Sequence, residues 1–136
     1  MHKIFTHKVK VYYEDTDAGG VVYYSNYLNF LERARTEAIT SIGLTNKKIR
    51  EDFRGFIIVK SCNIQYKISA YLEDELIINS FIKSVKKASF LMEQTIKKKK
   101  KIISKAEVHL VIVNDKGKPI KIPNDLFKKI KPYIEN

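Results

Sequence analysis

The sequence has little cysteine, proline or glycine, and it has no long apolar run. Its single cysteine, Cys62, has no partner for an internal disulfide, which favours a reducing compartment. The three prolines are Pro119, Pro123 and Pro132, so the middle of the chain is free of residues that interrupt strands and helices. No stretch approaches the roughly 20 apolar residues of a membrane-spanning helix. The alternating, charged start lacks the apolar region of a secretory signal. We therefore expect a cytoplasmic protein without a transmembrane segment.

The chain is strongly basic. Its 136 residues include 26 Lys and Arg against 15 Asp and Glu, a formal net charge of +11. Such a charge favours anionic partners, although a solvated, lysine-rich surface would give the same balance. The chain lacks the interleaved aromatic and basic residues of an RNA-recognition surface, so we expect no nucleic-acid partner.

The order of patterned segments predicts an α+β fold in one domain spanning residues 1–136. The long helix is expected to be capped by Ser25 or Asn26, to reach about Ile42, and to stop at Gly43. Its apolar residues recur at spacings of three and four, and we expect them to face an antiparallel sheet: Leu28, Leu31, Ala34, Ala38, Ile39 and Ile42. Strands are expected over residues 4–13, 56–69, 75–86, 88–97 and 102–113, with shorter helical segments near 45–53 and 124–133.

One segment, residues 12–27, concentrates the candidate chemistry. Glu14, Asp15 and Asp17 lie just before a Gly-Gly pair and the start of the helix. Glycine lets a backbone approach a ligand closely, and a helix N-terminus presents unpaired N–H groups. A carboxylate facing such donors is what acyl transfer to water needs. Acidic residues before a helix also commonly satisfy its free N–H groups, and Gly-Gly commonly marks a turn, so the residues alone leave both interpretations open.

Metal binding is a weaker interpretation of the same carboxylates. Asp15 and Asp17 match the opening of an EF-hand loop, but the twelfth position of that loop is Asn26 instead of glutamate. The three histidines, His2, His7 and His109, are scattered along the chain. We therefore expect no metal site.

Two motifs carry a resemblance to a known family. The run Y-x-E-D-T-D-A-G-G-V-V-Y from Tyr12, followed by Y-x-x-F-x-E-R-A-R-T-E from Tyr27, resembles the 4-hydroxybenzoyl-CoA thioesterase family. Within that family, the match is to the Tol–Pal-associated acyl-CoA thioesterase branch. The resemblance implies a hotdog fold, in which a five-stranded antiparallel sheet wraps one long central helix. It also implies a homodimer or homotetramer with active sites at the subunit interface.

The resemblance further implies hydrolysis of a short-chain or aromatic acyl-CoA. By the family motif, Asp17 is the catalytic carboxylate, acting as nucleophile or general base, and the Tyr24 backbone N–H is the oxyanion donor. Close relatives often carry histidine at the Tyr24 position, which leaves a backbone role intact. Asp15 is expected to orient the loop. Coenzyme A is then part of the substrate and product, so no separate cofactor is expected.

The same family places basic residues that contact coenzyme A at the turn carrying Lys86, Lys87 and Ser89, and Lys60 is a weaker candidate. Ile57, Ile58 and Val59 are expected in an apolar pocket wall. The run 97–101 is expected to form an exposed hairpin turn, and its five lysines could attract an acidic acyl carrier protein or anionic lipid headgroups. The alternative function is a non-hydrolytic module that binds acyl-CoA or acyl carrier protein, against which the presence of Asp17 argues.

Overall fold

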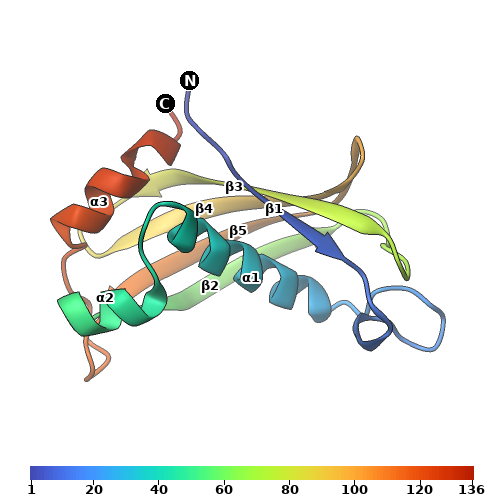
Figure 1. The fold of residues 1–136 in the computed structure, drawn as a ribbon, viewed down its shortest axis with the longest axis horizontal. Helices are drawn as coiled ribbons and strands as arrows, with labels where there is room; N and C mark the ends of the chain where they lie inside the picture. The colour runs from blue at the N-terminus through green and yellow to red at the C-terminus, as the bar shows by residue number, and fades with distance from the viewer.

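The computed structural model describes residues 1–136 and shows one antiparallel sheet with a long helix lying across it (Figure 1). The sheet order is β1-β3-β4-β5-β2. The strands are β1 (Phe5–Lys10), β2 (Phe56–Tyr66), β3 (Glu75–Val85), β4 (Ser89–Lys98) and β5 (Lys101–Val113). The helices are α1 (Asn26–Ser41), α2 (Asn46–Phe53) and α3 (Asn124–Ile130), with short 3₁₀ turns at Tyr13–Asp15 and Lys131–Tyr133. The expected α+β class and the five strands are confirmed.

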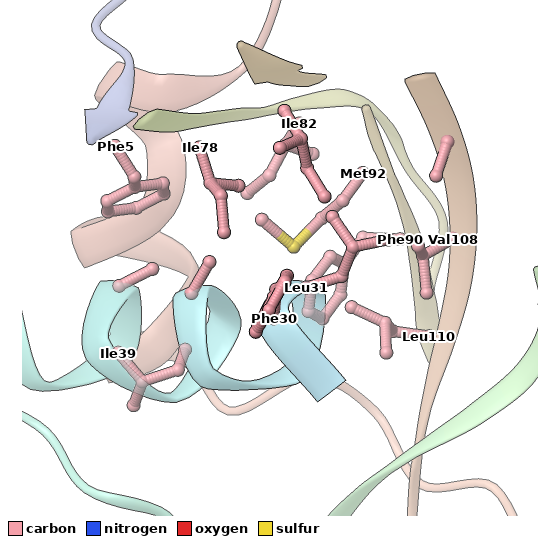
Figure 2. Packing of buried hydrophobic residues seen from close by; sticks show 14 of the residues in the cluster. Phe5, Phe30, Leu31, Ile39, Ile78, Ile82, Phe90, Met92, Val108 and Leu110 are labelled. Carbon is pink, nitrogen blue, oxygen red and sulfur yellow. The ribbon is translucent and has the colours of Figure 1, made fainter. Parts of the chain in front are cut away.

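The inward face of α1 builds the core. Phe30, Leu31 and Ala34 are almost fully buried, and Figure 2 shows Phe30 and Leu31 packed beside Met92 and the other strand residues. The prediction for Leu28 is wrong, because this side chain is 42% exposed. Tyr27 and Phe30 take the inward positions of the first turn instead. Adjacent residues of a helix point about 100° apart, so Leu28 faces away when Tyr27 faces the sheet.

The predicted C-terminal stop of α1 is present, but the side-chain cap predicted for Ser25 is not. Ser25 occupies the N-cap position but its side chain makes no capping hydrogen bond, so a side-chain cap from this residue is not present. The Asn26 side chain donates to the Asp15 carbonyl oxygen instead. At the other end, Gly43 has a φ of +87° and its N–H donates to the Thr40 carbonyl oxygen, as expected for the residue that stops the helix.

The strand β2 lies at the edge of the sheet and pairs only with β5. A strand was correctly predicted here, although the predicted range of 56–69 extends three residues beyond Tyr66. Cys62 is exposed and Tyr66 is 44% exposed, because no neighbouring strand covers the outer side of β2. The other edge of this 11-residue strand carries backbone donors and acceptors that β5 does not use. A long, exposed edge of this kind is suited to pairing with another strand.

The sheet has two distinct ends. At one, which we call the loop end, residues 11–25 pack against residues 67–74 through the hydrogen bonds Val22 N–H to Ala70 O and Leu72 N–H to Gly20 O. The turn between β4 and β5 lies at this end too, because Lys98 pairs with Lys101 there. The other end, which we call the helix end, carries α2, α3 and the turn between β3 and β4 (Figure 1). None of the helices is long and apolar enough to cross a membrane.

Candidate active site

The two aspartates of the motif lie in different surroundings. Asp15 is only 7% exposed, its Oδ2 accepts the Tyr12 N–H at 2.9 Å, and its carbonyl oxygen accepts the Tyr23 N–H at 3.0 Å. Asp17 is exposed, and its Oδ1 accepts only the Gly19 N–H at 2.8 Å. Asp15 therefore ties the loop together, whereas one oxygen of Asp17 has no partner within the chain.

The loop that carries Asp17 closes back on itself just before α1. Thr16 forms an antiparallel bridge with Val22, and the Asp17 N–H donates to the Val21 carbonyl oxygen at 2.9 Å. Gly20 has a φ of +78°, a left-handed conformation that glycine adopts without strain. The Gly-Gly pair thus forms the turn that returns the chain toward the helix, with Asp17 on one side of the Thr16–Val22 bridge and Tyr24 on the other.

The backbone N–H of Tyr24 is unpaired. It makes no hydrogen bond to any backbone or side-chain acceptor of the chain, although the following amides, from Asn26 onward, donate to carbonyl oxygens three residues earlier. The donor lies one residue before the N-cap of α1, where the helix dipole contributes positive potential. A free donor in this position is suited to an anionic or developing negative oxygen.

Three tyrosines gather beside this donor. The Tyr24 and Tyr66 rings meet edge to face with centroids 6.3 Å apart, and Tyr27 lies 5.5 Å from Tyr66. The Tyr27 hydroxyl accepts the Ala70 N–H at 3.0 Å, and burial raises the pKa of Tyr27, with the hydrogen bond from Ala70 opposing it. The cluster joins the start of α1 to the end of β2. Sequence reasoning did not find it, because Tyr66 is 39 residues from Tyr27 and only the fold brings them together.

The predicted coenzyme A residues do not lie beside Asp17 in the same chain. Lys86, Lys87 and Ser89 form the turn between β3 and β4 at the helix end, where the Lys86 N–H donates to the Ser89 carbonyl oxygen at 2.7 Å. The intervening strand β3 has 11 residues and is roughly 35 Å long. Lys60 is exposed on the β2 edge, at the position where the pairing with β5 shifts register. Within one chain, Asp17 and the predicted coenzyme A residues therefore lie at opposite ends of the sheet.

An apolar cavity of about 160 Å³ lies between α1 and the sheet. Ile57 and Val59 line it, as expected, but Ile58 does not, because alternate residues of a strand point to opposite faces. Figure 2 shows several of the strand residues around it, including Ile82, Phe90 and Leu110.

Arg35 also lines this cavity, although it was not predicted as a site residue. Its guanidinium donates to Gln94 Oε1 at 3.0 Å, and Gln94, which is fully buried, donates to the Leu31 carbonyl oxygen and to Ser80 Oγ. Burial lowers the pKa of Arg35, with Glu32 opposing it, and no carboxylate lies within ion-pairing distance of Arg35. The sequence signal was present, since Arg35 falls four residues from both Leu31 and Ile39 on the apolar face of α1.

Comparison with known proteins identifies the class to which this fold and loop belong. Residues 11–130 match the model of the thioesterase-like superfamily. The acyl-CoA thioesterase YbgC of Haemophilus influenzae is 40% identical over 123 residues, covering 90% of each chain. The structure of a probable thioesterase from Bartonella henselae has a TM-score of 0.86 and 31% identity, covering 89% of this chain and all of that one. A 4-hydroxybenzoyl-CoA thioesterase variant bound to 4-hydroxybenzoyl-CoA, at 20% identity, has a TM-score of 0.87 over 93% of this chain and 98% of that one, which shows the fold alone.

The chain therefore belongs to the thioesterase-like superfamily and has the hotdog fold of that class. Within it, the chain is of the YbgC type, and it is an acyl-CoA thioesterase. No group of three or more His, Cys, Asp or Glu side chains is placed to hold a metal ion.

Proposed function

We propose that Asp17 and the Tyr24 backbone N–H carry out the hydrolysis of a short-chain or aromatic acyl-CoA. The observation that carries the proposal is the pair of unused groups at the loop end, namely the free oxygen of Asp17 and the unpaired N–H of Tyr24. No hydrogen bond joins the two groups to each other, so both are available to a bound thioester. The carboxylate either attacks the thioester carbonyl or activates a water molecule, and both routes need the same ionised group.

The Tyr24 N–H polarises the thioester carbonyl and stabilises the negative charge that develops on its oxygen. The dipole of the 16-residue helix α1 adds positive potential at this point. Removing a donor of this type from an oxyanion site typically raises the barrier by about 3–4 kcal/mol. The role belongs to the backbone, so it does not depend on the tyrosine side chain.

A second copy of the chain completes the site in this proposal. If two copies pair through their exposed β2 edges, antiparallel and about a two-fold axis, Phe56 of one lies beside Tyr66 of the other. Phe56 is at the helix end and Tyr66 at the loop end, since they pair with Val113 and Ser104 of β5. The helix end of one copy then adjoins the loop end of the other.

The turn at the helix end carries the basic residues that the catalytic loop of its own chain lacks. The phosphates of coenzyme A are then held beside Asp17 by the partner's Lys86, the partner's Lys87 and the partner's Ser89. Exposed lysines are suited to phosphate groups, which they bind as point charges. Lys60, near the middle of β2, lies close to the two-fold axis. We propose a homodimer as the catalytic unit and a homotetramer as an assembly of two such units.

The cavity between α1 and the sheet is lined by no residue of the Asp17 loop and reaches Asn46 and Ile130 at the helix end, so we do not assign the acyl group to it. Coenzyme A is part of the substrate and the product, and no separate cofactor takes part. We place the enzyme in the cytoplasm, where a single free thiol such as Cys62 stays reduced.

The first experiment replaces Asp17 with asparagine and measures release of free thiol from a panel of acyl-CoAs. We expect kcat to fall by at least about a hundredfold, the usual contribution of a positioned base. Glu14→Gln is the matched control, because Glu14 is an exposed carboxylate of the same loop with no hydrogen-bond partner. Turnover by Asp17→Asn within a few-fold of the control would refute the assignment. Binding of acyl-CoA without hydrolysis by the unaltered protein would instead favour the non-hydrolytic binding module.

The second experiment mixes two damaged chains, Asp17→Asn and Lys86→Glu/Lys87→Glu, after mild denaturation and refolding together. If the site is shared, the mixed dimer contains one site with an intact Asp17 and an intact lysine turn, so activity at low acyl-CoA concentration returns. If each chain holds a whole site, every site in the mixed dimer keeps one defect and no activity returns. Absence of recovery, with mixed dimers present by native mass spectrometry, would contradict the shared site.

A further inference from the structure

The turn between β4 and β5 gathers an unusual density of positive charge. Residues 97–101 are five consecutive lysines, and the turn itself is formed by Lys99, which has a φ of 55°, and Lys100. We call residues 97–101 the lysine hairpin. Lys99, Lys100 and Lys101 are exposed, and none of them has a carboxylate within 4.0 Å. The charge of the hairpin is thus directed at the solvent.

Only one lysine of the hairpin is neutralised. Lys98 Nζ lies 2.8 Å from Asp74 Oδ1, and the other oxygen of Asp74 accepts the Tyr71 N–H at 2.9 Å. Burial alone would raise the pKa of Asp74, but the hydrogen bonds from Lys98 and from the Tyr71 N–H outweigh it and hold the pKa below its usual value. This contact fixes the base of the hairpin against residues 70–74 and leaves its tip free.

Apolar side chains are exposed directly beside these charges. An open groove runs along the hairpin, lined by Ile68, Ser69, Tyr71, Ile103 and the four lysines of residues 98–101. Ile68 is 46% exposed and Tyr71 is 53% exposed. Ile102, which follows the lysines on β5, is 43% exposed. Basic residues that lie beside an exposed aromatic and exposed branched aliphatic side chains are suited to a surface that is anionic at its outside and apolar beneath.

We propose that the lysine hairpin, with Ile68 and Tyr71, docks the protein on the anionic surface of a lipid bilayer. Clusters of four to eight basic residues bind such surfaces through the negative potential of acidic headgroups. Tyrosine is favoured at the headgroup level, where its ring is partly buried and its hydroxyl stays in water. The hairpin lies at the loop end, so docking places the Asp17 loop close to the bilayer. The docking itself does not depend on the role assigned to Asp17.

An acidic protein or a nucleic acid would be attracted by the same lysines. The exposed Ile68 and Tyr71 favour the bilayer, because an apolar contact adds nothing to binding of a phosphate backbone by charge alone. The test uses lipid vesicles alone, without any other protein or nucleic acid, so binding in it can come only from the lipid surface.

The experiment measures flotation of the whole protein with vesicles in the absence of acyl-CoA. Vesicles of phosphatidylcholine alone are compared with vesicles that contain 30% phosphatidylglycerol, on the order of the anionic fraction that gives a strongly negative surface. We expect binding to the anionic vesicles only, falling as salt rises from low to physiological concentration. Equal binding to both vesicles, or to neither, would overturn the proposal.

Two triple variants locate the surface. Lys99→Ser/Lys100→Ser/Lys101→Ser removes the hairpin charge, and we expect the partition coefficient to fall by about a hundredfold at low salt, at roughly fivefold per lysine. Lys116→Ser/Lys118→Ser/Lys121→Ser removes the same charge from exposed lysines at the helix end and is expected to bind nearly as well as the unaltered protein. An equal loss in both variants would show that net charge alone drives binding, and would overturn the assignment to the hairpin.

A third variant tests the apolar part of the surface. Ile68→Ser/Tyr71→Ser keeps every lysine, and we expect it to weaken vesicle binding about tenfold while leaving the salt dependence of the binding unchanged. The thermal midpoint of each variant is measured in parallel, so that loss of binding by a folded protein is distinguished from unfolding. Unchanged vesicle binding by this folded variant would contradict the role of Ile68 and Tyr71.

Discussion

Replacing Gln94 with leucine removes a polar junction from the centre of the fold. Gln94 has no exposed surface, and its amide makes hydrogen bonds to Arg35 on α1, to the Leu31 carbonyl oxygen of α1, and to Ser80 on β3. The side chain therefore ties β4 both to the helix and to the neighbouring strand. Leucine has a similar size, so the change tests the hydrogen bonds more than the packing.

The expected cost follows from these three contacts. The two neutral hydrogen bonds contribute about 0.5–1.5 kcal/mol each, and the one from the guanidinium contributes about 1.5–3 kcal/mol. Arg35 is then left without its acceptor beside an apolar cavity, while the leucine side chain gains some favourable apolar burial. We expect a loss of about 3 kcal/mol in the free energy of unfolding, and a thermal midpoint lower by about 10 °C for a domain of this size.

The assay is urea denaturation followed by far-ultraviolet circular dichroism, since the chain has no tryptophan for fluorescence. Protein concentration is held constant, because association of folded chains raises apparent stability. Thr95→Val is the control: Thr95 is the next residue of β4, points to the other face, and makes no side-chain hydrogen bond. A loss below about 1 kcal/mol for Gln94→Leu, compared with this control, would refute the view that the junction is important for stability.

Two further predictions concern the loop end. Tyr27→Phe removes the hydroxyl that accepts the Ala70 N–H. We expect this change to lower the free energy of unfolding by about 1–2 kcal/mol and to speed hydrogen exchange of the Ala70 amide. Unchanged exchange at that amide would contradict the assigned contact. Because the folded pKa of Asp74 lies below its unfolded value, its contribution to stability is present above the unfolded pKa and is lost as the pH falls through the folded pKa. Asp74→Asn should therefore flatten the acid limb of a stability-versus-pH curve, and an unaltered acid limb would count against the Lys98–Asp74 contact.

The long elements could be predicted because their patterns are local. The three-and-four spacing of Leu31, Ala34 and Ala38 correctly predicted α1. The strand β2 was predicted in the same way, because apolar Cys62, Ile64 and Tyr66 alternate with polar residues. Burial could not be predicted in the same way. The exposure of Cys62 and Tyr66 depends on β2 lying at the edge of the sheet, which is a property of strand order and not of the strand itself.

In the candidate site, too, residue types could be predicted from the sequence, but their burial and their neighbours could not. Asp15 and Asp17 lie two residues apart with the same chemistry, and only the structure shows that the first is buried by the loop while the second is exposed. The opposite placement of Lys86 could not be predicted from its position in the chain, because it depends on how β3 and β4 run through the sheet. Arg35 was visible as a charge within an apolar stripe, but its partner Gln94 is 59 residues away.

The separation of Asp17 from the lysine turn has a consequence for how activity scales with the amount of protein. If each site draws its carboxylate from one chain and its phosphate-binding lysines from another, a folded chain without a partner has two half-sites and no complete one. Catalytic output would then follow the concentration of pairs, and would fall faster than protein concentration on dilution below the dissociation constant of the dimer. Assembly would act as the first step of catalysis, and a substitution on the β2 edge could silence the enzyme without touching any group that meets the thioester.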